Sequence, residues 1–405
     1  MNTLAINGGT PVFSEPKTFA PWPPVYPETG DKLREIYMSA NWSFYGPIEG
    51  QFEKEFAAYH TSEYGIFMAN GTTTLECALA ALGIGPGDEV IVPSWTWMAT
   101  GMAPVYLGAT PVFVDGEKDT FCLDPEAFEA AITPRTKAVI PVHLFGSMAD
   151  MDKICAIADR HGIAVIEDCA HAHGGKWNGK GVGSFGKVGS FSFQQSKIMT
   201  SGEGGLCTTD DQNLFETISR LKHIGYAPGK KRGEVAGEPP AMNLLCHNYR
   251  ATEFQAQILL DQLHHLEADS LYRAENAEYL RTKLEAIPGL KTQSPGRCAT
   301  MQSYYVFGIT VDPEMLKPGL TKADVIAAVN AEGANEVFGG WGAVTYEQNL
   351  WNVSPEKYRV ESHEVVRDII KNRIILLGIQ WLMSDRAALD KLVEAFAKVM
   401  KAYTK

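Results

Sequence analysis

Lys197 is the residue whose position says most about the chemistry of this chain. It ends the apolar, strand-like run Ser190–Lys197 and lies just before the glycine-rich turn Ser201–Gly205. A lysine in such surroundings is partly desolvated, which lowers the pKa of its amine and frees the amine to attack a carbonyl carbon. The apolar and small neighbours favour this reading over a stray, solvated surface lysine.

A second strand-like run, Ala164–Glu167, delivers a carboxylate at its end, Asp168. A Schiff-base lysine and a carboxylate at two strand ends are what a pyridoxal phosphate (PLP) enzyme needs, because the lysine holds the aldehyde and the carboxylate holds the pyridine nitrogen. Taken singly, Asp168 is as well explained as a helix-capping residue. Together with the serine and glycine context, the two residues predict PLP as the cofactor.

Two other segments that follow predicted strands suit a flat, phosphorylated ligand. Asn70–Thr74 opens a predicted helix, where glycine allows close approach and the first N–H groups and hydroxyls bind an anion. It lacks a Walker lysine and the G-x-G-x-x-G spacing, so a plain N-cap remains the alternative. In Ser94–Trp97, a tryptophan is placed to cover one face of a planar ring, unless both tryptophans are core residues.

His171 and His173 stand close together after the predicted strand that ends at Asp168. A zinc site needs three or four ligands at recognisable spacing, and no partner cluster accompanies these two residues in the sequence. We therefore predict no metal.

Short apolar runs alternate with helical patterns from about residue 60 to 210. Continuous apolar strands interleaved with helices predict a mainly parallel sheet covered on both faces, with ligands bound at the carboxyl ends of the strands. Asn70, Ser94, His143 and Asp168 fall at those ends. The predicted strands are Tyr64–Ala69, Glu89–Pro93, Pro111–Asp115, Ala138–His143, Ala164–Asp168, Val188–Phe193 and Leu206–Thr209, and the helices include Thr73–Leu82, Pro125–Ile132 and Met151–His161.

The C-terminal third predicts a second, smaller α/β domain. A long helical stretch, Glu253–Ala286, leads into it, and we place the boundary between a large domain, 1–265, and a small one, 266–405. The expected elements of the small domain are Tyr304–Val311, Lys322–Glu332, Ile374–Leu377 and Arg386–Tyr403. The polar segment Tyr226–His247 predicts a long loop that covers the site or contacts a partner subunit.

Bulk composition narrows the function classes. The 405 residues carry a formal net charge of -12, which argues against non-specific binding to nucleic acid or to an anionic membrane. The 7 cysteines are scattered without a Cys-x-x-Cys pair, which fits reduced thiols in the cytoplasm. The opening residues show no signal-peptide pattern and no later stretch is long and apolar enough to span a bilayer, so we expect a cytoplasmic protein.

These segments together resemble one family over nearly the whole chain, the DegT/DnrJ/EryC1/StrS family of PLP-dependent aminotransferases. The resemblance implies fold type I, the aspartate aminotransferase-like fold, with a large mainly parallel sheet domain and a smaller C-terminal α/β domain. The matching segments are Asn70–Thr72, Gly87–Pro93, Glu167–His171, Ser192, Lys197, Gly202–Gly205 and Asn248–Arg250.

The resemblance also implies roles for individual residues. Lys197 carries the cofactor, Asp168 pairs with its protonated ring nitrogen, and Trp97 stacks on its ring. The phosphate is held by Gly71, Thr72 and Ser192, with Asn248 supplied by the other subunit of a homodimer. His171 stands where most of the family has glutamine, and it joins the predicted catalytic and cofactor-binding residues.

The acceptor ketone is the least constrained part of the prediction. His171 and the opening Leu4–Val12 resemble the branch that contains scyllo-inosose aminotransferases and 3-amino-5-hydroxybenzoate synthases, although Ile370–Arg373 departs from it. We expect transfer from glutamine or glutamate to a keto-cyclitol or keto-sugar in aminocyclitol or aminosugar biosynthesis. The alternatives are a nucleotide-linked ketosugar, a dehydrating 3-amino-5-hydroxybenzoate synthase-like reaction, and a non-catalytic PLP-fold regulator.

Overall fold

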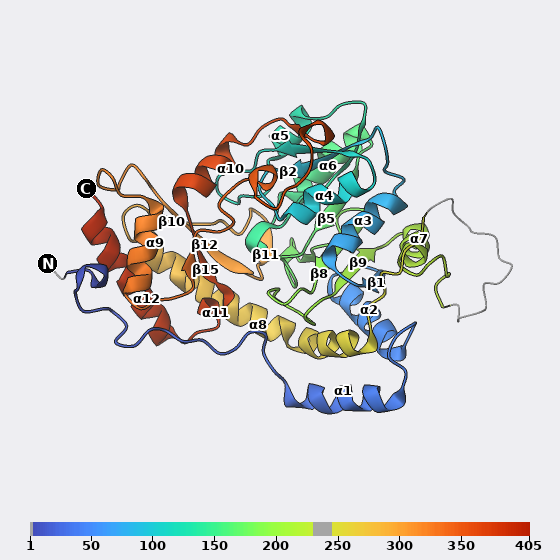
Figure 1. Cartoon of the computed structure of the whole chain (residues 1–405), viewed down its shortest axis with the longest axis horizontal. Helices are drawn as coiled ribbons and strands as arrows, with labels where there is room; N and C mark the ends of the chain where they lie inside the picture. Colours follow the sequence, from blue (N-terminus) through green and yellow to red (C-terminus); the bar gives the residue numbers. More distant parts are fainter. Residues whose placement is uncertain (1–2, 230–244) are drawn as a thin grey trace.

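The computed structural model describes residues 3–229 and 245–405. An eight-stranded sheet of order β1-β9-β8-β5-β4-β2-β3-β14 forms its centre (Figure 1). All neighbours pair in parallel except β9, which is antiparallel to β1 and β8, so the prediction of a mainly parallel sheet is confirmed. The strands are β1 (Tyr64–Met68), β2 (Glu89–Pro93), β3 (Thr110–Val114), β4 (Thr136–Val139), β5 (Ala164–Asp168), β8 (Val188–Ser192), β9 (Gly205–Thr209) and β14 (Arg359–Val360).

Helices cover both faces of this sheet because successive side chains of a strand point to opposite faces. In β1, Ile66 and Met68 pack in one hydrophobic cluster with α3 (Gly71–Ala81), α4 (Met98–Tyr106) and α7 (Gln212–Lys222). Phe67, between them, packs with α2 (Pro47–Tyr59) in another cluster. In β2, Ile91 points to the face of the sheet that is covered by α5 (Pro125–Ala130) and α6 (Met151–His161).

A smaller unit follows at the C-terminal end, as predicted. Its antiparallel sheet has the order β10-β12-β15-β13, and α9 (Lys322–Ala331) and α12 (Arg386–Tyr403) pack on it. The strands are β10 (Leu290–Thr292), β12 (Val306–Val311), β13 (Val337–Phe338) and β15 (Ile374–Gly378), followed by the short α11 (Ile379–Leu382). A further small sheet joins β6 (Lys176–Trp177), β7 (Lys180–Gly181) and β11 (Ala299–Met301).

Helix α8 (Glu253–Glu285) connects the two units and contacts both α2 and α12 (Figure 1). A capping box between Thr252 and Gln255 satisfies its first N–H groups. The boundary predicted between residues 265 and 266 falls inside α8, and it stays a prediction. The C-terminal stretch also returns to the large sheet, because β14 pairs with β3 and is followed by α10 (Glu364–Asp368).

Two predicted strands extend at least two residues beyond the observed ones. The run Ala138–His143 forms a ladder only to Val139 in β4, because Pro141 has no N–H to donate. The run Tyr304–Val311 starts as a strand only at Val306, because Tyr304 has a φ of 53° and cannot be extended. Both departures lie beside the cavity described below.

Two helices before the sheet are not among the elements expected from the sequence. They are α1 (Pro27–Ser39) and α2, and Figure 1 shows α1 running beside α8. Most of the predicted loop Tyr226–His247 lies outside the described residues. Within the described ranges, no helix has the length and apolarity needed to cross a membrane.

Candidate active site

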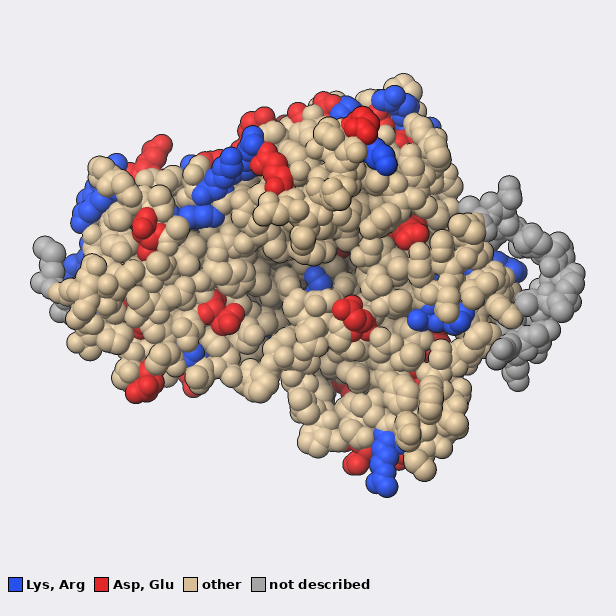
Figure 2. Space-filling view, viewed as in Figure 1, with Lys and Arg blue, Asp and Glu red and all other residues tan. Residues whose placement is uncertain are grey.

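A cavity of about 370 Å³ lies at the carboxyl ends of β1, β2, β5 and β8. Figure 2 shows this face of the molecule hollowed near its centre, with a basic side chain visible inside. Every residue predicted for the site except Asn248 lines the cavity, namely Gly71, Thr72, Trp97, Asp168, His171, Ser192 and Lys197.

Lys197 reaches the cavity from the turn between β8 and β9. Its backbone N–H donates to the carbonyl of Gln194 (2.8 Å), which closes the turn. Burial lowers the pKa of the Lys197 amine to about 8, although the nearby Asp168 raises it. At neutral pH an amine with this pKa is uncharged in roughly one tenth of the molecules, a far larger fraction than for an ordinary lysine, and the uncharged form is the nucleophile.

Asp168 ends β5 with its carboxylate facing the cavity, and it is 6% exposed. Oδ2 accepts a hydrogen bond from the Thr100 hydroxyl (2.8 Å), and Oδ1 accepts one from the Ala170 N–H (3.2 Å). Burial raises the pKa of Asp168, whereas these hydrogen bonds and the charge of Lys197 oppose the rise. In the described part of the chain, Asp168 forms no ion pair with a lysine or arginine. A cationic ring nitrogen of a bound ligand would therefore supply its ion-pair partner.

The start of α3 forms an anion cradle. The side chain of Asn70 caps the helix by accepting from the N–H groups of Thr72 and Thr73, at 3.1 and 3.0 Å. Gly71 allows β8 to come close, since a Cβ there would lie 2.6 Å from the Cβ of Ser192. The hydroxyls of Thr72 and Ser192 therefore line the cavity next to a helix N-terminus, which carries partial positive charge.

The two tryptophans after β2 have different roles. Trp95 is 1% exposed and belongs to the core, whereas Trp97 is 43% exposed and lines the cavity. Trp97 packs against Trp341 with 5.8 Å between ring centroids. Trp341 also contacts Phe145 and His171, so these aromatic rings form one wall.

His171 is buried in a stack of aromatic rings, nearly parallel to Tyr305 at 4.2 Å. Burial holds the pKa of His171 well below its usual value, so the imidazole is neutral. Nδ1 accepts from the N–H of Phe145 (3.3 Å), which assigns the proton to Nε2. Because His171 lines the cavity, Nε2–H is a donor available to a bound ligand.

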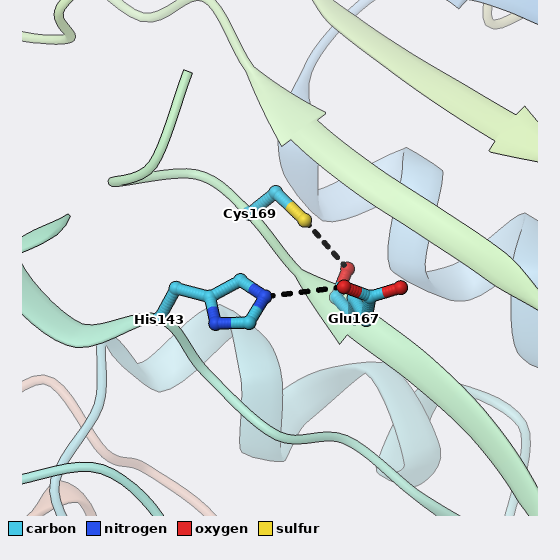
Figure 3. A group of neighbouring side chains, drawn as sticks. All are labelled: His143, Glu167 and Cys169. Atoms are coloured by element: carbon cyan, nitrogen blue, oxygen red, sulfur yellow. Dashed lines mark hydrogen bonds and ion pairs between the residues drawn. The ribbon is translucent and has the colours of Figure 1, made fainter. Parts of the chain in front are cut away.

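A second group of polar side chains lies behind the cavity. Figure 3 shows His143, Glu167 and Cys169, whose ligand atoms come within 4.8 Å of one another. The Glu167 carboxylate already accepts from His143 Nε2 (3.2 Å) and from the N–H groups of Gly183, Phe185 and Gly186. Burial raises the pKa of the Cys169 thiol far above its usual value, so it stays protonated. These hydrogen bonds form a network that anchors β5.

Other polar residues near the strand ends do not reach the cavity. Ser94 and His143 are fully buried, and the Ser94 hydroxyl donates to the carbonyl of Ser362 (2.8 Å). His173 is buried against Phe191 and Phe193. Asn248 is exposed and absent from the cavity wall of its own chain, as a residue that serves another subunit would be.

The structure adds residues that the sequence did not single out. Thr100 donates to Asp168 from α4, and Tyr305 and Trp341 enter the cavity from the C-terminal unit. Thr100 was foreseeable in part, because it lies one helical turn after Thr96, and Thr96 belongs to a segment that the sequence already predicted to border the ligand. Tyr305 and Trp341 carry no local signal, since only the fold brings the C-terminal residues to the large sheet.

The cavity fits the predicted cofactor on the chemistry of its donors. It combines a desolvated lysine, a buried carboxylate without a cationic partner, and a glycine cradle at a helix N-terminus. These three features match the aldehyde, the ring nitrogen and the phosphate of PLP.

Comparison with known proteins gives one consistent result. A model of the DegT/DnrJ/EryC1/StrS aminotransferase family matches residues 26–396. The L-glutamine:2-deoxy-scyllo-inosose aminotransferase of Streptoalloteichus tenebrarius is 36% identical, and the match covers 98% of this chain and 97% of that protein.

Solved structures agree with this result. An aminotransferase from Psychrobacter cryohalolentis superimposes with a TM-score of 0.86 and 31% identity, over 95% of this chain and 100% of that one. A 3-amino-5-hydroxybenzoic acid synthase gives a TM-score of 0.83 and 30% identity, over 96% and 100%.

Proposed function

We propose that this chain, which belongs to the DegT/DnrJ/EryC1/StrS aminotransferase family, transfers the amino group of glutamine to a ketone on a free cyclitol ring. The protein is a PLP-dependent aminotransferase. The observation that carries the acceptor proposal is the charge of the cavity wall. Among the described residues that line it, Lys197 is the one lysine or arginine, and Asp168 and Glu203 are acidic.

This charge pattern favours a neutral polyol. A nucleotide-linked sugar brings a diphosphate, which is normally bound by several lysines or arginines. The cavity in one chain, about 370 Å³, lies at the small end of the range of about 300 to 1,000 Å³ for small-ligand cavities, which also favours a compact acceptor.

The residues of the cavity have separate roles in transamination. When bound, PLP supplies the carbonyl that takes up the amino group and a ring that accepts electrons. Lys197 Nζ moves the proton from the α-carbon of the donor, as general base and then as general acid. Asp168 would keep a proton on the ring nitrogen of the bound cofactor, and Nε2–H of His171 would donate a hydrogen bond to the bound group. Trp97 and Trp341 exclude water from the faces of the bound rings.

The working unit in this proposal is a cytoplasmic homodimer with shared sites. Asn248 supports it, because this residue is exposed and lies off the cavity of its own chain. No disulfide joins any of the 7 cysteines, all of which lie within the described residues, and this favours a reducing compartment. The arguments for the homodimer and for the cytoplasm are both independent of which ketone is the acceptor.

An acceptor panel tests the proposal. Purified enzyme with PLP and glutamine is offered scyllo-inosose, its 2-deoxy form, and nucleotide-linked 3-keto- and 4-keto-sugars, and the products are weighed by mass spectrometry. We expect amination of the free cyclitol ketones. Turnover of the nucleotide-linked ketones alone would reject the cyclitol assignment. A product that has lost water in addition would instead support the chemistry of the 3-amino-5-hydroxybenzoic acid synthase that this fold resembles.

A further inference from the structure

We propose that Tyr305 is a positioning residue that sets the places of both Lys197 and His171. Its ring holds the lysine amine whenever that amine is not bound to the cofactor, and it fixes the plane of the imidazole. This inference rests on the proposed roles of Lys197 and His171, and it holds for any acceptor.

Tyr305 contacts both groups directly. The Lys197 Nζ lies 4.8 Å from the centroid of the Tyr305 ring, within the distance of a cation–π contact. The imidazole of His171 stacks on the same residue at 4.2 Å, with an angle of 12° between the planes. The Tyr305 hydroxyl bonds to the hydroxyl of Ser196 (2.9 Å), the neighbour of Lys197 in sequence. One side chain therefore touches the proton carrier, its supporting turn and the neutral histidine.

The backbone places this ring by means of two strained turns. Tyr304 has a φ of 53° and Phe145 a φ of 61°, both in the left-handed region that non-glycine residues seldom occupy. The turns meet where the N–H of Tyr305 donates to the carbonyl of Phe145 (3.1 Å). A Cβ at Gly146 would lie 2.8 Å from the backbone nitrogen of Tyr304, so only glycine permits the approach. Such strain persists where the surrounding structure fixes the geometry, and it clusters at active sites.

The contact also affects the charge of the lysine. The Tyr305 ring contacts the amine, Asp168, His171 and His173 lie within its electrostatic range, and Glu203 lies on the cavity wall. Both histidines are held neutral by burial, so neither repels the charged amine. Among the described residues, Asp168 is the carboxylate that favours the charged form of the amine, and the ring adds a second attraction for that form. Without the ring, the desolvated amine should give up its proton at lower pH.

The function of this contact follows from the flexibility of lysine. Four carbon atoms joined by rotatable bonds separate Nζ from the backbone, so the amine can move widely. After its release, the amine has to stay within reach of the reacting carbon atoms. A ring beside the cavity gives the amine one resting place. The same ring keeps His171 in the orientation that directs Nε2–H at the ligand.

The first test uses the cofactor-free enzyme and needs no substrate. The pKa of Lys197 is read from its ¹³Cε resonance, assigned by its absence in Lys197→Ala. Loss of a cation–π contact in Tyr305→Leu should lower this pKa by roughly 0.5–1.5, whereas Tyr305→Phe keeps the ring and should retain the wild-type value. Tyr346→Leu is the matched control, since Tyr346 is a half-buried tyrosine bonded to His363.

The second test is the rate at which the PLP-loaded enzyme reacts with glutamine, followed by cofactor absorbance. Tyr305→Leu should slow it by about ten- to a hundredfold, the range for a reacting group displaced by a fraction of a bond length. Tyr305→Phe should slow it much less, because it keeps the ring and removes only the bond between the Tyr305 and Ser196 hydroxyls.

The possible outcomes separate this inference from the proposed function. If borohydride fails to attach PLP to Lys197 in the wild-type enzyme, the proposed site is wrong. If it succeeds and the Tyr305→Leu lysine titrates at or above the wild-type pKa, only the role of Tyr305 is wrong. A Tyr305→Phe pKa as low as that of the leucine variant would equally overturn it.

Discussion

The hydroxyl of Thr100 donates to the carboxylate of Asp168 at 2.8 Å, and it also lies 2.9 Å from the hydroxyl of Thr96. A hydroxyl has one proton, so when Thr100 donates to Asp168 the bond between the two threonines has Thr96 as its donor. The first turn of α4 thus directs a short relay of hydroxyls at the buried carboxylate. Thr96 and Thr100 are each 1% exposed, which shields the relay from water.

Thr100→Val should therefore weaken the hold of Asp168 on the cofactor. A hydrogen bond to a charged group contributes about 1.5–3 kcal/mol, so we expect the reaction with glutamine to slow by roughly ten- to a hundredfold. Stopped-flow absorbance of the PLP-loaded variant measures this rate.

Thr96→Val is the matched control, because it leaves the Thr100–Asp168 bond in place and removes only the outer donor. It should slow the reaction less than Thr100→Val does. Equal losses in both variants would show that the helix is disturbed as a whole and that the bond to Asp168 has no separate effect.

The lysine itself gives a prediction of pH dependence. Its pKa is lowered to about 8 by burial, and only the uncharged amine attacks the aldehyde of the cofactor. The rate of PLP loading by cofactor-free enzyme should therefore rise with pH and level off above a midpoint near 8, where an ordinary lysine would still be rising. Absorbance after rapid mixing from pH 6.5 to 9.5 measures the midpoint. In Lys197→Ala, borohydride should fix no PLP covalently to the chain. A covalent PLP adduct in that variant would show that Lys197 is not the residue that binds the aldehyde.

The sequence predicted the parts of the site that have local causes. Gly71 and Lys197 follow strands in patterns that the chain itself displays, whereas Ser192 was assigned through the family resemblance. The apolar runs that predict those strands are preserved in the fold. Tyr305 and Trp341 could not be found in this way, and Thr100 only in part, because their importance comes from contacts across the fold. The late start of the strand predicted from Tyr304 has the same origin, since a positive φ is imposed by packing against Gly146.

Trp341 should decide the size of the acceptor. It lies between Gly340 and Gly342, both with positive φ, and its indole packs against Trp97, Phe145 and His171 at the cavity wall. Trp341→Ala removes the C-terminal part of this wall, so the apparent KM for a cyclitol ketone should rise by about tenfold or more, the loss expected for an aromatic stacking contact.

Two comparisons make the test of Trp341 specific. Trp341→Phe keeps an aromatic face and should stay within about threefold of the wild-type KM. The rate of the reaction with glutamine should change little in either variant, because glutamine presents no ring to stack. An alanine variant that slows both half-reactions equally would mean that Trp341 supports the cavity without selecting the acceptor.

Asn248 allows the shared site to be tested by complementation. If it holds the phosphate in the other subunit, a hybrid of Lys197→Ala and Asn248→Ala chains has one site with both residues intact and one site with neither. The hybrid, purified with two different tags after co-expression, should then show about half the wild-type activity per dimer, while each parent homodimer is impaired in both sites. Asn352→Ala is a control for an exposed asparagine, and it should bind PLP as the wild type does. If Asn248 acts within its own chain, every Asn248-bearing chain of the hybrid lacks Lys197, and no activity would be restored above that of the Asn248→Ala parent.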